Sequence, residues 1–432
     1  MKTTRERIAI VDGIRTPMAK AGGPLEHTQA DDLGAYIVRQ IIERNRITVD
    51  EFDEVIIGNV AQPAHAANIA RVIALKAGFP VATPAFTVHR NCASGMESIT
   101  SASSKLLMNA GDIYLAGGAE SMSNIPLFFN AAFTSFVDRM MRSKTFFAKV
   151  GTLFSFRPRM LRPEIGVIHG LTDPVSGFIM GMTAENLARE FRISREEQDA
   201  YALASHQRAV AAAENDLLHG EIVPVPIMPF YREVLSQDFG PRPGQSMEAL
   251  AKLKPYFDRK NGTVTVGNSC PVTDGAAAVI LMREHDAKRR GLEPLGYLVD
   301  WVYAGLEPER MGLGPTYATA KLFKRTGAKL SDIEYIEMNE AFAAQMIANE
   351  RAFASRSFAK KYLDMDAPLG ELDRDIMNLQ GGAIALGHPV GMTGTRLVIH
   401  TLRELRRQNR NTGLATLCIG GGQGASLLLE VA

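Results

Sequence analysis

The chain has 432 residues, of which 46% are hydrophobic and 22% charged, and its formal net charge is +1. This length exceeds one ordinary hydrophobic core, so two or three domains are expected. The near-neutral charge argues against nucleic-acid binding, and no apolar run approaches the ~18 residues of a membrane span. Three widely spaced cysteines without a C-x-x-C pair fit neither a disulfide framework nor a zinc site and favour a reducing compartment.

The N-terminal stretch from Met1 to Pro17 is charged and then passes directly into a strand pattern at residues 8–11. It has no apolar signal-peptide core. We therefore expect a cytoplasmic location, or a mitochondrial one if a transit peptide has been removed.

The first 123 residues alternate between strand and helix patterns. Such alternation predicts a mostly parallel sheet covered by helices. Strands are expected at residues 8–11, 55–57, 85–88 and 113–116, the last ending in the turn GGAES, and helices from Asp31, over 68–78 and from Ala93.

The alternation stops after Ser123. Residues 125–163 carry eight of the twenty phenylalanines and seven Lys or Arg against the single acid Asp138. The aromatic residues fall largely on one helical face, which is typical of an element that docks on a membrane surface or a partner. A helix that covers the core or lines a substrate tunnel gives the same pattern, and this second interpretation is slightly preferred.

The chain returns to regular patterns with a capping box at Ser194–Glu197, which predicts a helix through Ala211. A proline-rich stretch follows, then strand patterns at 263–266 and 276–282. The domains predicted are an N-terminal α/β half (1–123 with 261–283), an inserted loop domain (124–260) and a C-terminal α/β half (284–432). Within the last, strands are expected at 333–338, 414–418 and 426–431, and a helix at 395–405.

Four stretches place a reactive or polar residue at the end of a predicted strand: Cys92, Asn339, His388 and Cys418. Open α/β sheets carry their sites at such positions. Cys92 precedes a helix whose free N–H groups and dipole favour a thiolate. From its own stretch alone, a small buried cysteine that only packs is an equally good explanation.

Two thiols and an imidazole together indicate acyl transfer combined with making or breaking a C–C bond. A thiolate is a strong nucleophile, and a nearby histidine can take its proton. A second cysteine, with an ordinary pKa of about 8.5, suits proton transfer to carbon. The glycines that follow Cys418 leave backbone N–H groups open to a ligand.

The sequence resembles the thiolase family. The segments that carry the resemblance are RNCASG, GGAESMS, SREEQDAYALASHQRA, NEAFAAQ, GGAIALGHPVGMTG and CIGGGQGASLLLE, in the family's usual order. The resemblance implies a thiolase fold, with two similar α/β halves in a layered αβαβα core and an inserted loop domain in the N-terminal half. AKLKPYF and LGPTYATAK further resemble the trifunctional-complex β-subunit branch and its bacterial counterparts, which often carry histidine at the position of Asn339.

The resemblance also implies a role for each site residue. Cys92 would attack the 3-keto carbon of a 3-ketoacyl-CoA after His388 takes its proton, and His388 would later help to hold the enolate oxygen. Asn339 would hold a water in that oxyanion site. Cys418 would protonate the departing acetyl-CoA carbanion. The backbone N–H groups of Cys92 and Gly420 would form a second oxyanion hole for the thioester.

The implied function is that of a 3-ketoacyl-CoA thiolase of fatty-acid β-oxidation. Acetyl-CoA acetyltransferase, a decarboxylating ketoacyl synthase and a non-catalytic scaffold subunit are the alternatives, and Cys418 argues against the synthase. No metal and no tightly bound cofactor are expected, because coenzyme A is a substrate. Expected partners are a second or further copies of the chain (dimer or tetramer), a hydratase/hydroxyacyl-CoA dehydrogenase subunit and a membrane surface.

The coenzyme A contacts are expected on the inserted domain and the turn near residue 268. Met182 and Ser269 are the candidates. Cys270 is interpreted as structural or as a pantetheine contact, and His65 and His89 as structural.

Overall fold

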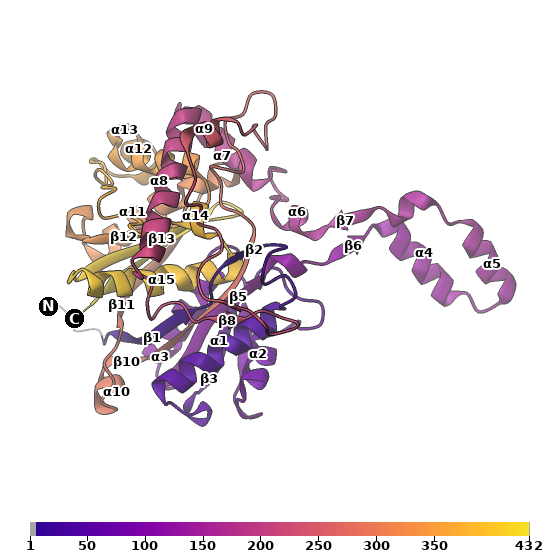
Figure 1. The fold of residues 1–432 in the computed structure, drawn as a ribbon, viewed down its shortest axis with the longest axis horizontal. Coiled ribbons are helices and arrows are strands. Elements are labelled where there is room, and N and C mark those ends of the chain that lie inside the picture. Colours follow the sequence, from indigo (N-terminus) through magenta and orange to yellow (C-terminus); the bar gives the residue numbers. More distant parts are fainter. Residues whose placement is uncertain (1–5, 432) are drawn as a thin grey trace.

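The computed structural model describes residues 6–431, so Met1–Arg5 of the charged N-terminal stretch lie outside the described residues. Figure 1 shows a rounded body from which one arm projects. The body is built on a ten-stranded sheet with strand order β12-β13-β14-β11-β1-β10-β5-β3-β4, and β2 pairs with β10. The strands are β1 (Ile8–Arg15), β2 (Ala19–Lys20), β3 (Glu54–Gly58), β4 (Ala85–Val88), β5 (Ile113–Ser121), β10 (Thr273–Arg283), β11 (Gly296–Gly305), β12 (Tyr335–Met338), β13 (Thr412–Ile419) and β14 (Gln423–Glu430).

The prediction of a mostly parallel sheet is wrong. Only β3–β4, β3–β5 and β12–β13 pair in parallel, and the other pairs of this sheet are antiparallel. Strand–helix–strand units supply only the two ends of the sheet, whereas its middle is made of strands that return antiparallel, such as the β13–β14 hairpin. The two halves meet where β1 pairs with β11 over Ile8–Ile10.

The buried hydrophobic residues form three clusters, and layers of helices alternate with layers of strands to give five layers in all. Helices α1 (Ala30–Asn45) and α2 (Ile69–Ala77) cover the outer face of the first half, and α11 (Gly314–Thr326) and α12 (Ala343–Ala354) cover that of the second. Helices α3 (Ser94–Leu107) and α15 (Val390–Arg407) lie between the halves, in a cluster that draws on strands of both. The layered αβαβα core expected from the sequence is confirmed.

The two central helices approach each other closely because glycines line their crossing. A Cβ added to Gly95 would lie 2.6 Å from the backbone nitrogen of Thr395, and one added to Gly394 would lie 2.4 Å from that of Met96. Gly95 also lies against the carbonyl of Gly391, so the crossing is at the start of both helices. Since Cys92 and His388 each come two residues before one of these helices, the crossing brings their loops together.

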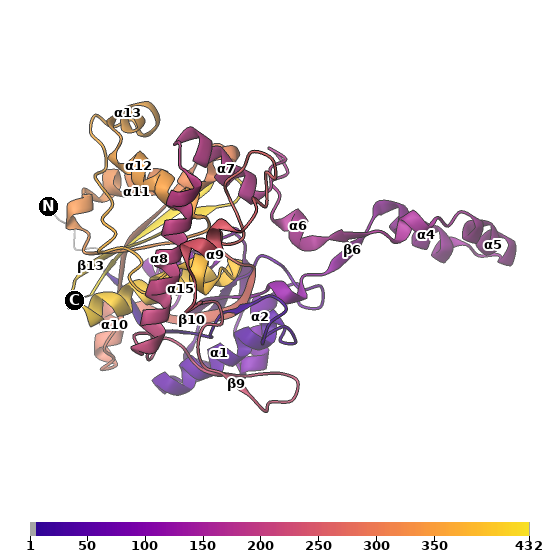
Figure 2. The same cartoon turned by 45° about the horizontal axis from the view of Figure 1, so that its top comes forward.

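Residues 124–260 divide into an arm and a part that packs on the body. The arm consists of β6 (Leu127–Phe129), α4 (Ala131–Arg142), α5 (Phe146–Phe154) and β7 (Pro163–Ile165), and α6 (Gly166–Gly170) joins it to the body (Figure 2). Helices α7 (Met180–Glu190) and α8 (Arg195–Glu214) pack on α12 and, for α8, on α14 (Ala383–Leu386). The domain boundaries themselves stay a prediction.

The preferred interpretation of residues 125–163, a helix that covers the core or lines a tunnel, is wrong. Helices α4 and α5 point away from the body, and Phe136 is the only residue buried in either of them (Figure 1). The segment is two helices rather than one, because Thr145 accepts a hydrogen bond from the N–H of Ala148 (3.2 Å) and starts a new helix. Inside the arm, Phe129, Phe133, Phe136 and Phe156 contact one another in sequence.

Two local predictions fail and one is confirmed. Strand β5 runs on through GGAES to Ser121 instead of turning, with its glycines passing close to neighbouring carbonyls. Residues 263–266 form no strand, because the Glu185 carboxylate accepts the N–H groups of Thr263 and Val264 at 2.9–3.0 Å. The capping box at Ser194 and Glu197 is present and starts α8.

Among residues 6–431, no helix is long and apolar enough to cross a membrane.

Candidate active site

Cys92 lies in a tight turn between β4 and α3. The Ser94 hydroxyl accepts the N–H of Arg90 (2.8 Å) and donates to the carbonyl of Asn91 (2.7 Å), which fixes the turn from inside. Asn91 has φ +44°, in the left-handed region that asparagine tolerates better than most residues. The sequence thus builds a compact turn that presents the residue after Asn91.

The Gly420–Gly422 loop of the β13–β14 hairpin lies beside this turn. Gly421 and Gly422 have φ +85° and +79°, and a Cβ on Gly422 would lie 2.3 Å from the carbonyl of Leu306. A Cβ on Gly420 would lie 3.2 Å from Met180 Sδ. The Asn91 amide donates to the Gly420 carbonyl at 2.8 Å, which joins the loop to the nucleophile turn.

The surroundings of Cys92 keep its thiol protonated. Burial raises the pKa of Cys92, and the N–H of Gly420, which hydrogen-bonds to the cysteine, offsets this only in part. The prediction that the helix start yields a resting thiolate is therefore wrong, since burial outweighs the backbone donors. Cys92 needs a base to become a nucleophile.

His388 has the properties of that base. Burial, with a contribution from the positive charge of Arg396, lowers the pKa of His388 to about 4, so the ring is neutral at pH 7. The Thr393 hydroxyl donates to the Pro389 carbonyl (2.9 Å), and therefore accepts from His388 Nδ1 (2.6 Å). This leaves the lone pair on Nε2, which is buried and has no partner among the described residues.

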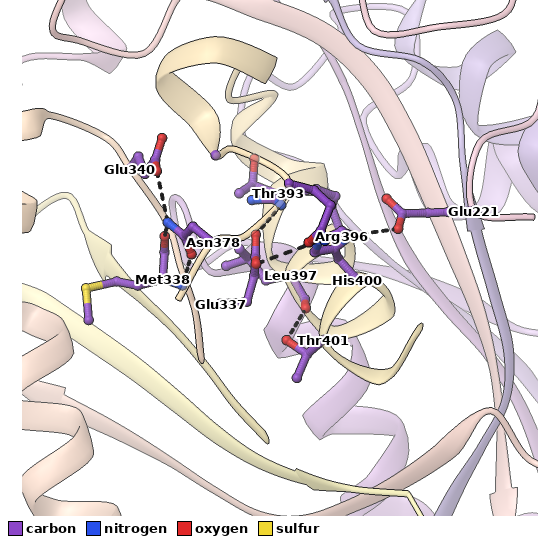
Figure 3. Close-up of polar contacts among 12 residues, drawn as sticks. Glu221, Glu337, Met338, Glu340, Asn378, Thr393, Arg396, Leu397, His400 and Thr401 are labelled. Carbon is purple, nitrogen blue, oxygen red and sulfur yellow. Dashed lines mark hydrogen bonds and ion pairs between the residues drawn. The ribbon is translucent and has the colours of Figure 1, made fainter. Parts of the chain in front are cut away.

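Asn339 follows β12 directly and presents an unused side-chain amide. Its Nδ2 and Oδ1 are buried and have no partner among residues 6–431. Its two neighbours are held firmly: Asn378 bonds both the N–H and the carbonyl of Met338 (2.9 and 2.8 Å) and also reaches Glu340 (3.0 Å), as Figure 3 shows. A buried amide without a partner, on a rigid strand end, is suited to bind a ligand oxygen or a water.

The other two cysteines lie near Cys92. Burial raises the pKa of Cys418 well above its usual range, and the proximity of Cys92 and Cys270 raises it further. Burial also raises the pKa of Cys270 to about 12, again with a contribution from Cys92. The ordinary pKa expected for Cys418 is thus wrong, and all three thiols share one region.

Buried charged side chains hold in place the elements that carry the site residues. Glu120 accepts the N–H groups of Val60, Ala61 and Gly391 at 2.9–3.0 Å, and burial raises its pKa to about 7. Arg396 on α15 pairs with Glu337 on β12 at 2.5 Å, with both side chains almost wholly buried (Figure 3). This ion pair fixes the helix that follows His388 relative to the strand that precedes Asn339.

The candidate coenzyme A residues lie on the elements around this region. Ser269 is buried, and its hydroxyl donates to the carbonyl of Thr265 (2.7 Å), while its backbone bridges to Phe342. Met182 is half-buried on α7, but its neighbour Met180 is the methionine that faces Gly420. His65 pairs with Asp31, whereas His89 lies beside the turn of Cys92 and contacts the N–H of Asn91.

Sequence reasoning missed four residues of the site: Asn91, Glu120, Met180 and Thr393. Thr393 lies five positions after His388, within one helical turn of the helix start, and this spacing could have indicated it. Glu120 is part of a quoted motif but no role was assigned to it. Asn91 and Met180 act across long sequence separations and leave no local signal.

His388 follows the helix α14 and not a strand, so the strand-end position predicted for it is wrong. A five-layered αβαβα fold with two thiols and a buried amide near strand ends, and with a neutral histidine on an adjoining loop, defines a thiolase-type acyltransferase. Residues 8–285 match the thiolase N-terminal domain and residues 292–431 match the thiolase C-terminal domain. The chain belongs to the thiolase family.

Known proteins with similar sequence or structure carry thiolase names. A 3-ketoacyl-CoA thiolase of Yersinia enterocolitica is 40% identical over 427 residues, which cover 99% of this chain and 97% of that protein. Human mitochondrial 3-ketoacyl-CoA thiolase in complex with CoA superposes with a TM-score of 0.84 at 34% identity, covering 99% and 98% of the two chains. The acetyl-CoA acetyltransferase of Bacillus anthracis has a TM-score of 0.85 at 36% identity, covering 99% of both chains.

Proposed function

We propose that this protein is a 3-ketoacyl-CoA thiolase, which cleaves 3-ketoacyl-CoA with coenzyme A to acetyl-CoA and a shortened acyl-CoA in fatty-acid β-oxidation. The observation that carries the proposal is the crossing of α3 and α15, which brings the loop of Cys92, a protonated thiol, next to the loop of His388, a neutral imidazole whose Nε2 is free. The Yersinia relative named 3-ketoacyl-CoA thiolase supports it.

In the first half-reaction, His388 Nε2 takes the Cys92 proton as the sulfur attacks the 3-keto carbon. Cleavage of the C–C bond leaves an acyl group on Cys92 and an enolate of acetyl-CoA. His388 and a water held by Asn339 stabilise the enolate oxygen, and Cys418 donates the proton to its carbon. The high pKa of Cys418 suits this role, because the carbanion that it protonates is a strong base.

In the second half-reaction, the Cys418 thiolate takes the proton of the coenzyme A thiol as that sulfur attacks the acyl-Cys92 thioester. The Cys92 thiolate that leaves takes back the proton held by His388, which restores all three side chains. The N–H groups of Cys92 and Gly420 stabilise the oxyanion that forms, and each such donor contributes roughly 3 kcal/mol in other acyl-transfer enzymes. Coenzyme A is thus a substrate and no resident cofactor takes part. Met182 and Ser269 are proposed to contact it, supported by their place on the elements that surround the thiols.

Acetyl-CoA acetyltransferase is the rival activity, since the Bacillus anthracis structure carries that name. The two activities share the same chemistry, so the length of the acyl chain that the protein accepts distinguishes them. Steady-state thiolysis rates on 3-ketoacyl-CoA substrates of four to sixteen carbons separate the two: we expect activity above four carbons. Activity confined to acetoacetyl-CoA would favour the acetyltransferase, and activity on no substrate would favour a scaffold subunit.

Residues 125–163 are proposed to dock on a membrane surface or on a hydratase/hydroxyacyl-CoA dehydrogenase subunit. Phe147, Phe154 and Met141 are 84%, 79% and 80% exposed, and basic residues lie among them. Interleaved aromatic and basic side chains suit an anionic, partly apolar surface. Sedimentation with vesicles that contain anionic phospholipid, compared with neutral vesicles, tests the membrane alternative, and pull-down of the partner subunit tests the other.

We also propose that the protein forms a homodimer or tetramer and that it is located in the cytoplasm. All three cysteines are unpaired, as expected in a reducing compartment. Light scattering on the purified protein measures the number of copies.

A further inference from the structure

We propose that Asn91 is a positioning residue that keeps the second oxyanion hole assembled, by tying the nucleophile turn to the Gly420–Gly422 loop. The inference rests on the roles proposed above for the N–H groups of Cys92 and Gly420. It concerns a residue that touches no reacting atom and acts through its neighbours.

An oxyanion hole works only if its donors are held in place before the charge develops. One of the two proposed donors belongs to Gly420, the first of three consecutive glycines, which form the least restrained kind of backbone. Gly421 and Gly422 both have positive φ, so the loop depends on glycine at those positions. The loop therefore needs an external restraint close to Gly420.

Asn91 supplies that restraint. Its Nδ2 donates to the carbonyl of Gly420 at 2.8 Å, across 329 positions of sequence. The carbonyl and the N–H of Gly420 flank the same Cα, so fixing the one limits rotation of the other. Because Asn91 directly precedes Cys92 in the chain, the hydrogen bond from Asn91 to Gly420 also sets the distance between the N–H groups of Cys92 and Gly420.

The backbone of Asn91 is itself held firmly enough to act as an anchor. Its carbonyl accepts the Ser94 hydroxyl (2.7 Å) and the Ser94 N–H (3.0 Å). Its left-handed conformation, φ +44°, restricts the residue types that fit. Position 91 thus requires a residue that tolerates the left-handed conformation and also donates a hydrogen bond. Asparagine meets both requirements.

A second contact between the same two segments is weaker. Arg90 Nη1 lies 3.4 Å from Gln423 Oε1, at the far end of the glycine loop, and the guanidinium stacks on the Tyr303 ring at 4.0 Å. The 3.4 Å separation is long for a hydrogen bond. The N–H of Gly420 also hydrogen-bonds to Cys92, but this N–H is itself the proposed oxyanion donor. The Asn91 amide is thus the connection at Gly420 that leaves the donor free for the oxyanion.

Two variants separate the hydrogen bond from the backbone conformation. Asn91→Gly keeps the left-handed conformation accessible and removes the amide. Asn91→Asp keeps the size and shape but places a carboxylate oxygen against the Gly420 carbonyl. Asn409→Gly is the matched control, because Asn409 is also an asparagine with positive φ (+58°), lies at an exposed position after α15, and is at the opposite end of β13 from the Gly420–Gly422 loop.

The experiment compares two reactions of Cys92. Acylation by acetyl-CoA, followed by rapid quench and intact-mass measurement, uses the oxyanion hole. Alkylation by iodoacetamide uses the same thiol but no oxyanion. We expect Asn91→Gly to slow acylation roughly five- to ten-fold, the range of one lost hydrogen bond, with alkylation unchanged. Asn91→Asp should slow acylation at least as much, and Asn409→Gly should change neither reaction.

Acylation of Asn91→Gly at the wild-type rate would overturn the inference. So would an equal loss in both reactions, because Asn91 would then support only the thiol. Failure of the wild-type protein to acquire an acyl group on Cys92 is distinguishable from both outcomes, and it would overturn the proposed function together with this inference.

Discussion

The body and the arm use the same kinds of residue in opposite ways. In the body, several charged side chains are buried and held by several partners, as Glu120 is by three backbone N–H groups. In the arm, Arg142 pairs with Asp138 four positions earlier on α4, and both are exposed to solvent. Aromatic residues are likewise buried in one region and largely exposed in the other. The difference supports the proposals that the chemistry belongs to the body and that the arm docks on a membrane surface or a partner.

A matched pair of arginine substitutions tests this comparison and has the largest expected effect on stability. Arg396→Met leaves Glu337 buried without its partner, and breaking a buried pair in this way costs about 3–5 kcal/mol. Arg142→Met removes an exposed pair between neighbouring turns, which contributes about 0.3–0.5 kcal/mol. Chemical denaturation of both variants measures the free energy of unfolding. Equal losses in the two variants would contradict the comparison.

The pH dependence of acylation tests whether burial controls the base. With a pKa near 4, His388 stays neutral between pH 5 and 7, and it gains a proton, with loss of rate, only as the pH falls through about 4. The rate of Cys92 acylation should therefore change less than about two-fold from pH 7 to pH 5. If His388 had the ordinary pKa of about 6.5, the rate would fall about twenty-five-fold from pH 7 to pH 5.

Circular dichroism at each pH controls for unfolding. A half-maximal rate near pH 6.5 in folded protein would show that His388 is not shielded as the structure indicates. Glu120 titrates near pH 7, and any inflection of the rate there should disappear in Glu120→Gln.

Excision of the arm should have the smallest effect on chemistry. Leu127 of β6 pairs with Ile165 of β7, so residues 128–164 can be replaced by a short glycine-containing turn. We expect thiolysis of a water-soluble substrate within two-fold of wild type, together with loss of binding to anionic vesicles. Charge reversal at Arg139, Arg142 and Lys149 should weaken vesicle binding without excision. A large loss of thiolysis on excision would show that the arm takes part in catalysis.

The candidate site residues were predictable because each lies in a short motif, next to a strand end for Cys92, Asn339 and Cys418, and on the loop between α14 and α15 for His388. The five-layered fold followed from the resemblance to a family. Strand direction did not follow, because β10 and β14 return antiparallel to partners distant in sequence. The pKa values of Cys92 and Cys418 were misjudged for a similar reason: burial depends on the whole fold, whereas a helix start is visible locally. The contact from Asn91 to Gly420 spans too much sequence to leave a pattern.

The central claim is that Cys92 carries the acyl group while Cys418 moves the proton at carbon. The direct test follows Cys418→Ser in two assays, acyl labelling of Cys92 by acetyl-CoA and exchange of the acetyl methyl hydrogens of acetyl-CoA with deuterium in solvent. The account predicts that labelling persists, that exchange falls to background, and that Cys92→Ala loses both labelling and thiolysis. Normal exchange in Cys418→Ser, or thiolysis in Cys92→Ala, would contradict it.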